Sequence, residues 1–305
     1  MSAAPEPVCV LPIAAELGEG PVWRARERAL WFVDIKASRI HRFRPDTGAH
    51  RDWKAPAPVG FIAPVEGGGW IAGLKTGLHR FDPESGAFTL LKRVEDPGLD
   101  NRLNDGYVDA QGRLWFGSMH DPEEALTGAL YRFDCNGLTR SDEGYCITNG
   151  PVTNPEGSIL YHTDTLRKVI WAFDLGSDGS LWNKREFVRI EDSAGYPDGS
   201  AMDAEGCLWT ALYGGWGARR YSPAGELLQY VRFPVAHVTK LAFGGADLKT
   251  AYATTAWNGL SAREREEQPL AGGVFAFSIE VPGEPQHKVR LDTSAFGSPT
   301  ASKHR

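Results

Sequence analysis

Six segments of the chain repeat one pattern, and this repeat limits the possible folds more than any other feature of the sequence. Each segment has a short strand built around a large aromatic residue, followed by a second strand that ends near another aromatic residue. The aromatic residues at equivalent positions are Trp31, Trp70, Trp115, Tyr161, Trp209 and Tyr252. They follow one another at intervals of roughly 39, 45, 46, 48 and 43 residues, which is the spacing expected of four-stranded propeller blades.

The repeat predicts an all-β fold, a six-bladed β-propeller with four antiparallel strands per blade. The 35 Gly and 20 Pro residues are spread along the chain, as expected for many short strands joined by turns. A β-sandwich, the alternative, gives no reason for such a period. We expect residues 1–305 to form a single propeller domain with an ordered core over about 8–295 and a flexible tail over 296–305. Residues 8–14 are expected to close the ring by pairing with the last blade.

Composition excludes several classes of protein. Ten Trp, fourteen Phe and nine Tyr supply enough apolar area for a large core, which excludes a disordered chain. No apolar run approaches the ~18 residues of a spanning helix, so we expect no membrane segment. A net charge of −6 without any Lys/Arg-rich block argues against a nucleic-acid partner.

The amino terminus and the cysteines predict a cytoplasmic protein. The first seven residues have neither the basic nor the apolar region of a signal peptide. The four cysteines, Cys9, Cys135, Cys146 and Cys207, are isolated from one another, so a disulfide framework is not expected. We expect a monomer or weak oligomer that binds a small molecule.

Four repeats begin their innermost strand alike, with a carboxylate or amide residue followed by glycine. These pairs are Glu19-Gly20, Asp105-Gly106, Asn149-Gly150 and Asp198-Gly199. Because propeller blades are related by rotation, the four side chains are expected to converge in the mouth of the central channel. Their oxygens would repel one another there, and a set without Cys or His suits Ca²⁺, Mg²⁺ or Mn²⁺. Each pair could instead be an ordinary turn signal, but four pairs in register favour a metal site.

Four motifs that contain these pairs resemble those of the SMP-30/gluconolactonase family, the regucalcin-like sugar lactonases. The motifs are Leu17–Trp23, Arg102–Gly106, Thr148–Gly150 and Tyr196–Ser200. The resemblance extends from about residue 16 to residue 277, and it implies a six-bladed propeller with one divalent metal at the channel mouth. Carried over by motif, the metal ligands are Glu19, Asn149 and Asp198, completed by water.

The resemblance also implies a set of substrate contacts. Arg102 and Asn104 would contact the substrate or the metal-bound water, with Asp105 nearby. The loop at residues 118–124 overhangs the site in this family, and His120 and Asp121 are therefore expected to bind substrate. This loop has its own composition here, so the identity of the substrate stays open. Pro151, where the family usually has Leu or Ile, is expected to alter the edge of the strand but not the ligand Asn149.

Together these observations predict metal-dependent hydrolysis of a sugar-acid lactone, such as glucono-, xylono- or arabinonolactone, to the free aldonic acid. One divalent ion (Ca, Zn, Mn, Mg or Fe(II)) would polarise the carbonyl, and Asp198 would take a proton from water. Two alternatives remain: an esterase or phosphotriesterase-like hydrolase of the same fold, and a non-catalytic calcium-binding propeller. A serine esterase is not supported, because the sequence has no G-x-S-x-G motif.

Overall fold

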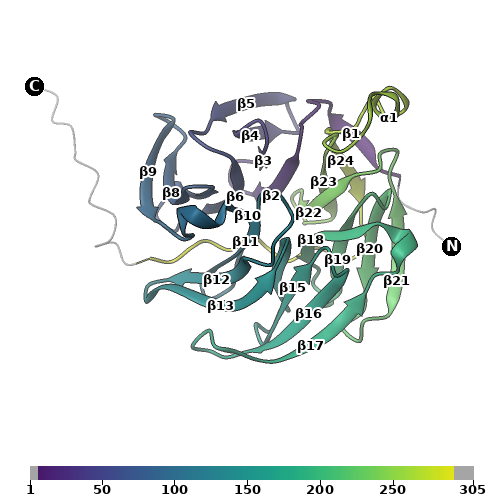
Figure 1. The fold of residues 1–305 in the computed structure, drawn as a ribbon. Helices are drawn as coiled ribbons and strands as arrows, with labels where there is room; N and C mark the ends of the chain where they lie inside the picture. Colours follow the sequence, from purple (N-terminus) through teal and green to yellow (C-terminus); the bar gives the residue numbers. More distant parts are fainter. Residues whose placement is uncertain (1–5, 292–305) are drawn as a thin grey trace, which may run out of the picture.

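The computed structural model describes residues 6–291. Within this range, 24 strands form six four-stranded antiparallel sheets arranged around a central channel, as Figure 1 shows. The fold is therefore the predicted six-bladed β-propeller. The innermost strands of neighbouring blades contact one another all the way around the channel, so the ring is closed.

The first three blades comprise the strands between residues 18 and 145. Blade 1 contains β2 (Gly18–Arg24), β3 (Ala29–Asp34), β4 (Arg39–Arg44) and β5 (Ala49–Lys54). Blade 2 contains β6 (Val59–Pro64), β7 (Trp70–Leu74), β8 (Gly77–Asp82) and β9 (Ala87–Lys92). Blade 3 contains β10 (Asn101–Val108), β11 (Leu114–His120), β12 (Gly128–Asp134) and β13 (Gly137–Tyr145).

The other three blades follow in chain order, and the last one combines both ends of the chain. Blade 4 contains β14 (Thr148–Thr153), β15 (Ile159–Asp164), β16 (Val169–Leu175) and β17 (Leu181–Arg189). Blade 5 contains β18 (Tyr196–Met202), β19 (Leu208–Tyr213), β20 (Gly217–Tyr221) and β21 (Leu227–Arg232). Blade 6 contains β22 (Val238–Gly244), β23 (Thr250–Thr255), β24 (Val274–Ser278) and β1 (Val8–Leu11).

Short helices occur only in connections within the described residues. They are η1 (Pro97–Leu99), η2 (Asp192–Ala194) and α1 (Ala262–Glu267). The α1 helix occupies the charged segment between β23 and β24 and is capped by Ser261, whose side chain accepts a hydrogen bond from the Glu264 backbone. None of the helices is long and apolar enough to cross a membrane.

The ring closes through the amino-terminal strand, as the sequence predicts. Strand β1 pairs antiparallel with β24, with Val8 opposite Ala276. This pairing joins the two ends of the chain in one sheet and leaves no gap between the first and last blades. The predicted tail, 296–305, and the end of the predicted ordered core, 292–295, lie outside the described residues.

The repeating aromatic residues form the core between blades. All six lie on the second strand of their blade and are buried. Trp31 of blade 1 packs against Trp70 of blade 2 with ring centroids 4.6 Å apart, and Tyr252 of blade 6 stacks on Trp23 of blade 1 at 5.4 Å. The repeat therefore persists because each blade must bury one face against the next.

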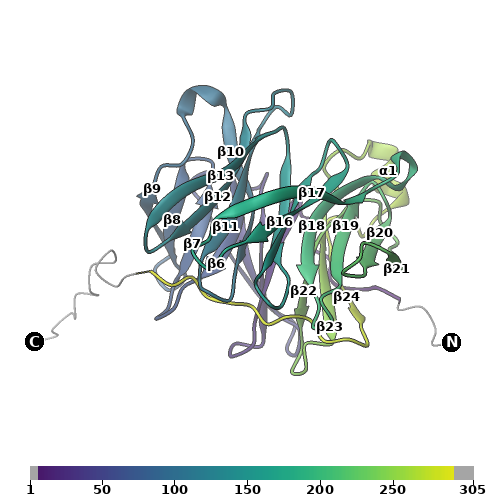
Figure 2. The ribbon, with the colours of Figure 1, turned by 90° about the horizontal axis from the view of Figure 1, so that it is seen from below.

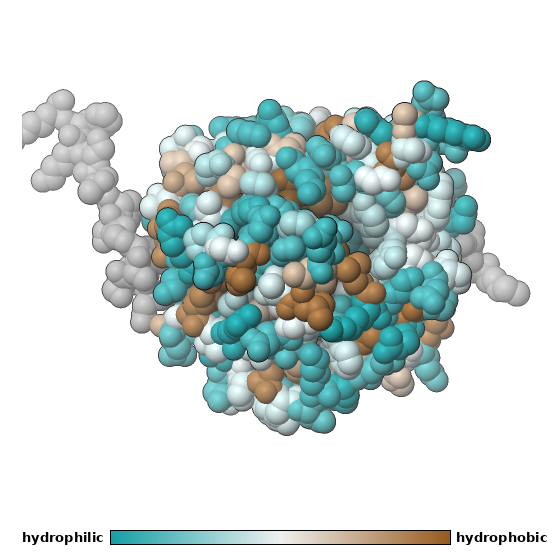
Figure 3. Space-filling view, viewed as in Figure 1, coloured by the Kyte–Doolittle hydropathy of each residue, from teal (hydrophilic) through white to brown (hydrophobic). Residues whose placement is uncertain are grey.

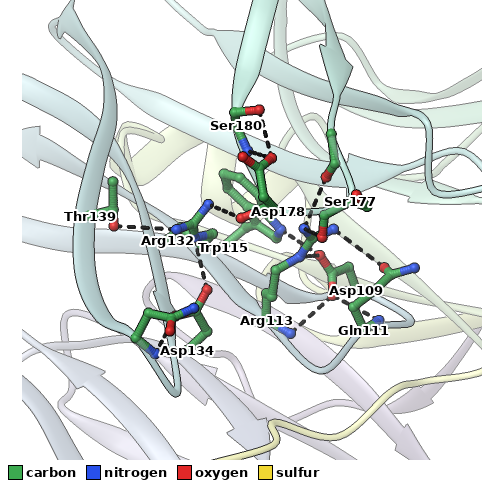
Figure 4. A network of polar contacts seen from close by, with 12 residues as sticks. Asp109, Gln111, Arg113, Trp115, Arg132, Asp134, Thr139, Ser177, Asp178 and Ser180 are labelled. Carbon is green, nitrogen blue, oxygen red and sulfur yellow. Dashed lines mark hydrogen bonds and ion pairs between the residues drawn. The ribbon is translucent and has the colours of Figure 1, made fainter.

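Two buried aspartates, Asp109 and Asp203, hold the connection between the first two strands of their blades. Asp109 accepts hydrogen bonds from the backbone of Arg113 at 2.9 Å, from Arg113 Nε at 2.6 Å and from Trp115 Nε1 at 2.8 Å. Figure 4 shows this network, which extends to Arg132 at the junction with blade 4. Asp203 repeats the arrangement in blade 5 and accepts from Trp209 Nε1 at 3.0 Å. Each aspartate fixes both a turn and an aromatic anchor.

The segment 280–291, which we call the strap, crosses the end of the channel opposite α1 (Figure 2). Its backbone joins three blades: Glu284 N donates to Met202 O at 3.0 Å, Val289 N to Pro64 O at 2.8 Å, and Arg290 N to Gly112 O at 2.9 Å. The strap thus covers one end of the channel and leaves the other end as the place for a site.

Candidate active site

A β-bulge recurs in the innermost strands at the end of the channel opposite the strap. The pairing of β2 with β3 shifts between Glu19 and Val22, and β14 shifts in the same way after Asn149. The glycine after each of these residues, Gly20 or Gly150, has φ of 53°, a left-handed conformation that favours glycine. A bulge turns the side chain beside it out of the regular alternation of the strand. The Glu-Gly and Asn-Gly pairs are therefore structural requirements of the bulge as well as markers of the site.

The bulges open onto a cavity of about 390 Å³ at this end of the channel. Its polar lining consists of Glu19, Arg102, Asn104, Glu123, Asn149, Thr165, Asp198 and Asn258. Its apolar lining includes Leu17, Met119, Ile147, Leu166, Tyr196 and Tyr213. Figure 3 shows apolar side chains gathered near the centre of the face viewed in Figure 1, with hydrophilic side chains around them. A cavity with apolar walls and a few converging polar groups is typical of a small-molecule site.

A chain of hydrogen bonds fixes the amide and guanidinium groups of the cavity. Arg102 Nη1 donates to Asn104 Oδ1 at 2.5 Å, and Asn104 Nδ2 donates to Asn149 Oδ1 at 2.8 Å. Asn149 Nδ2 in turn donates to Thr165 Oγ1 at 3.0 Å. These bonds orient Asn149 so that its Oδ1 atom is the acceptor, and that oxygen keeps a second lone pair.

The two carboxylates of the cavity, Glu19 and Asp198, have few stabilising contacts. Both are only 5% exposed. Within residues 6–291, neither forms an ion pair, and Asp198 Oδ1 is buried without a hydrogen-bond partner. Burial raises the pKa of both groups, and repulsion by Asp105 raises each further. Burying two carboxylates that form no ion pair lowers the free energy of unfolding. A bound cation would offset this loss.

The donor set fits a hard divalent cation. Glu19 and Asp198 offer carboxylate oxygens and Asn149 offers an amide oxygen, all from one cavity. No three His, Cys, Asp or Glu side chains form a metal-binding group in the part of the chain that the structure describes. The amide oxygen of Asn149 is therefore the third protein ligand that we expect, and an oxygen-only set of this kind suits Ca²⁺, Mg²⁺ or Mn²⁺.

The fourth member of the predicted ring, Asp105, does not line this cavity. Its carboxylate is buried and hydrogen-bonded to Lys240 Nζ and to the backbone nitrogens of Gly106 and Gly150, the latter two at 2.7 and 2.8 Å. The structure thus brings Glu19, Asn149 and Asp198 together at the mouth, as expected. Asp105 instead points towards the ammonium group of Lys240 on blade 6. The sequence analysis did not identify Lys240.

Two of the predicted substrate contacts lie on the overhanging loop but outside the cavity lining. Asp121 accepts hydrogen bonds from Arg102 Nε at 3.0 Å and from Lys75 Nζ at 2.8 Å. His120 Nδ1 accepts from the backbone nitrogens of Glu124 and Ala125, each at 3.2 Å. His120 therefore shapes the loop and Asp121 positions Arg102, and the contact of either residue with substrate stays a prediction.

Four lining residues with polar groups, Glu123, Thr165, Tyr213 and Asn258, were not predicted from the sequence. Glu123 enters the cavity from the same loop, with φ of 64°. Tyr213 and Asn258 enter from blades 5 and 6, and Tyr213 donates to the backbone oxygen of Asn258 at 2.5 Å while its ring stacks on His237 at 3.9 Å. The loop at 118–124 was a signal for Glu123, but no local motif marks Tyr213 or Asn258.

Comparisons with known proteins agree with this fold. Residues 17–257 match the model of the family described as "SMP-30/Gluconolactonase/LRE-like region". The chain is 36% identical over 279 residues to a 6-deoxy-6-sulfogluconolactonase of Pseudomonas putida, covering 90% of this chain and 95% of that protein. It is 34% identical over 275 residues to regucalcin of Homo sapiens, with 88% and 92% covered.

Solved structures give the same result. A calcium-binding protein, regucalcin, from Agrobacterium tumefaciens superposes with a TM-score of 0.90 at 26% identity, covering 95% of this chain and 98% of that chain. The match covers nearly the whole of both chains, so the fold is shared with this relative.

Proposed function

Because the chain belongs to the SMP-30/gluconolactonase/LRE-like family, which includes sugar lactone lactonases, we propose that it hydrolyses a sugar-acid lactone to the free aldonic acid with the help of one divalent cation. One observation carries the proposal. Two buried carboxylates without a cation, Glu19 and Asp198, share a cavity with Asn149. This arrangement becomes favourable when a divalent ion occupies it.

Glu19, Asn149 and Asp198 would hold the ion. When bound, a divalent cation supplies Lewis acidity to a lactone carbonyl and lowers the pKa of water. Asp198 can hold the cation through one carboxylate oxygen and accept the proton of the attacking water on the other.

Arg102 and Asn104 are suited to a polyhydroxylated substrate. Arg102 Nε and Nη1 are held by Asp121 and Asn104, and no hydrogen bond of Nη2 is seen among residues 6–291. This free edge of a cationic group can donate to a sugar hydroxyl or to the negative oxygen that develops at the carbonyl. The apolar wall formed by Met119, Ile147 and Tyr213 would exclude bulk water from the ring face of the lactone.

The sulfonated substrate in the name of the Pseudomonas relative puts an anionic lactone within the proposed class. The cavity volume of about 390 Å³ accommodates a hexonolactone with or without such a group. The substrate panel therefore includes glucono-, xylono-, arabinono- and 6-deoxy-6-sulfogluconolactone, with an aryl ester to represent the esterase alternative.

The test is hydrolysis followed with a pH indicator after chelation and after re-addition of Ca²⁺, Mg²⁺, Mn²⁺, Fe²⁺ or Zn²⁺. We expect turnover of at least one lactone, its loss on chelation and its recovery with a divalent ion. Glu19→Gln and Asp198→Asn should each lower kcat/KM by at least about a hundredfold, whereas Glu66→Gln, at an exposed position near the strap, should not change it. Full activity in either site variant would refute the ligand assignment, and ion binding without turnover of any substrate would favour a non-catalytic calcium-binding propeller.

A further inference from the structure

One lysine crosses the channel directly below the proposed metal site. Lys240 lies on β22 of blade 6, and its ammonium group donates to Asp105 Oδ1 on β10 of blade 3 and to the backbone oxygen of Gly106 at 3.3 Å. Lys240 is 6% exposed and Asp105 is 1% exposed. Lys240 also lines the space at the strap end of the channel, together with Glu284 and Gln286. The pair therefore forms a buried floor between the cavity and the strap end of the channel.

This floor is packed against the residues that follow the proposed ligands. A Cβ atom on Gly199 would lie 2.5 Å from Lys240 Cγ, so the aliphatic part of Lys240 fills the space beside the residue after Asp198. Asp105 Oδ2 accepts from the backbone nitrogen of Gly150 at 2.8 Å, and Gly150 follows Asn149. The Lys240–Asp105 pair thus touches the backbone next to two of the three ligands without contacting a ligand side chain.

Four buried residues at the cavity and its floor set the formal charge around the proposed ion. Glu19, Asp198 and Asp105 contribute three negative charges, and Lys240 contributes one positive charge. The Lys240–Asp105 pair packs against Gly199 and accepts a hydrogen bond from Gly150, so its charges lie next to the residues that would hold the ion. Arg102 and Glu123 also line the cavity. Arg102 is paired with Asp121 at 3.0 Å, and both groups stay the same in every variant below, so they do not alter the charge differences that the variants introduce. The four-residue cluster therefore carries a formal charge of −2.

We propose that Lys240 is a positioning residue that lowers the charge of this cluster from −3 to −2, matches it to one divalent cation and so discriminates against trivalent ions. The inference rests on the proposed function, since it assumes an ion held by Glu19, Asn149 and Asp198. Its physical basis is that a unit charge fixed in a buried site acts on a cation in proportion to the cation's own charge. A positive Lys240 therefore disfavours a trivalent ion more than a divalent one.

Four proteins test the inference by changing the charge of the cluster in steps. The wild type carries −2, Lys240→Met carries −3, Asp105→Asn carries −1, and the double variant Asp105→Asn/Lys240→Met returns to −2. Methionine is close to lysine in length, so it keeps the packing against Gly199. Lys54→Met, the same substitution at an exposed position of blade 1, is the matched control.

The measurement is the affinity of each protein for Ca²⁺ and for Tb³⁺ by isothermal titration calorimetry, which does not depend on catalysis. Relative to the wild type, Lys240→Met should raise the ratio of Tb³⁺ to Ca²⁺ affinity by about tenfold or more, and Asp105→Asn should weaken Ca²⁺ binding by about tenfold or more. The double variant should return to within about threefold of the wild-type ratio. Lys54→Met should leave the ratio unchanged.

The possible failures are distinguishable. If the wild type binds neither ion, the proposed metal site itself is wrong. If the wild type binds Ca²⁺ but all variants keep its affinity ratio, Lys240 has only a packing role and the inference is overturned. A double variant that binds as weakly as Asp105→Asn would also overturn it, because the effect would then come from loss of the Gly150 contact rather than from charge. If Lys240→Met does not fold, the double variant can still be used, because it buries no uncompensated charge. Comparing its ion affinities with those of Asp105→Asn then decides between a charge effect and a packing effect.

Discussion

Replacing Asp109 by Asn tests whether the buried aspartates stabilise the blades. Asp109 is fully buried, and its Oδ2 atom accepts from Arg113 Nε at 2.6 Å and from Trp115 Nε1 at 2.8 Å. An asparagine of the same shape keeps one carbonyl oxygen for the turn backbone and presents an amide group to these two donors. The substitution therefore removes the counter-charge of Arg113 and leaves the indole N–H of Trp115 without an acceptor.

The expected magnitude follows from the contacts that remain. Removing one partner of a buried ion pair costs about 3–5 kcal/mol. Arg113 keeps hydrogen bonds from Nη1 to the backbone oxygens of Gly176 and Ser177, both at 3.2 Å, which places the loss near the lower end, at about 3 kcal/mol. For a chain of this size about 2 °C of melting temperature corresponds to each kcal/mol, so Asp109→Asn should melt about 6 °C below the wild type.

Differential scanning calorimetry measures the effect, and Asp178→Asn is the matched control. Asp178 belongs to the same network in Figure 4, but its side chain is exposed and its carboxylate accepts only from Ser180. Its substitution should lower the melting temperature by less than about 2 °C. Asp203→Asn, in the equivalent position of blade 5, should behave like Asp109→Asn. The reasoning is refuted if Asp109→Asn and Asp178→Asn lower the melting temperature equally.

Three further results are expected. Burial, and then His50, lower the pKa of His41 from 6.5 to about 4, so between these pH values the folded protein binds fewer protons than the unfolded chain. Through this group, the free energy of unfolding should therefore fall by about 3 kcal/mol as the pH drops from 7 to 4. Urea unfolding at both pH values should show a smaller fall in His41→Phe than in the wild type. Equal falls in the two proteins would contradict the lowered pKa of His41. A divalent ion at a hundred times its Kd should raise the free energy of unfolding by about 2.7 kcal/mol in the wild type and not in Glu19→Gln, and an equal rise in both proteins would place the ion elsewhere. Asp121→Asn should release Arg102 Nε, which Asp121 holds at 3.0 Å, and raise KM by about tenfold with a smaller change in kcat; steady-state kinetics that show an unchanged KM would exclude a role for this pair in substrate binding.

Much of the fold follows from local patterns in the sequence. Each blade buries one face against the next blade, and the aromatic residue of each repeat lies on that face. Trp31, Trp115 and Trp209 therefore occupy equivalent buried positions. The closure by residues 8–11 follows from the same logic, since a ring of six sheets needs a fourth strand for its last blade. The aromatic positions follow from the repeat itself. The closure follows because a complete ring must join its last blade to the start of the chain, so a repeat in the sequence suffices to predict both.

The candidate site was predictable only in part. Glu19, Asn149 and Asp198 stand at equivalent points of three repeats, and rotational symmetry brings them to one cavity. The different orientation of Asp105 could not be predicted, because its partner Lys240 is 135 residues away in a blade that lacks the carboxylate-glycine pair. The same holds for Tyr213 and Asn258, which no motif marks.

The sequence by itself thus determined the number of blades, the burial of one aromatic residue in each and the ring position of the acidic and amide residues, since all of these arise from interactions within a blade or between neighbouring blades. Only the tertiary structure decided which of the ring residues face the cavity and which face a cation across the channel. The physical reason is that a buried charge takes the orientation in which it finds a counter-charge or a hydrogen-bond donor, and across a closed channel that partner can come from any blade.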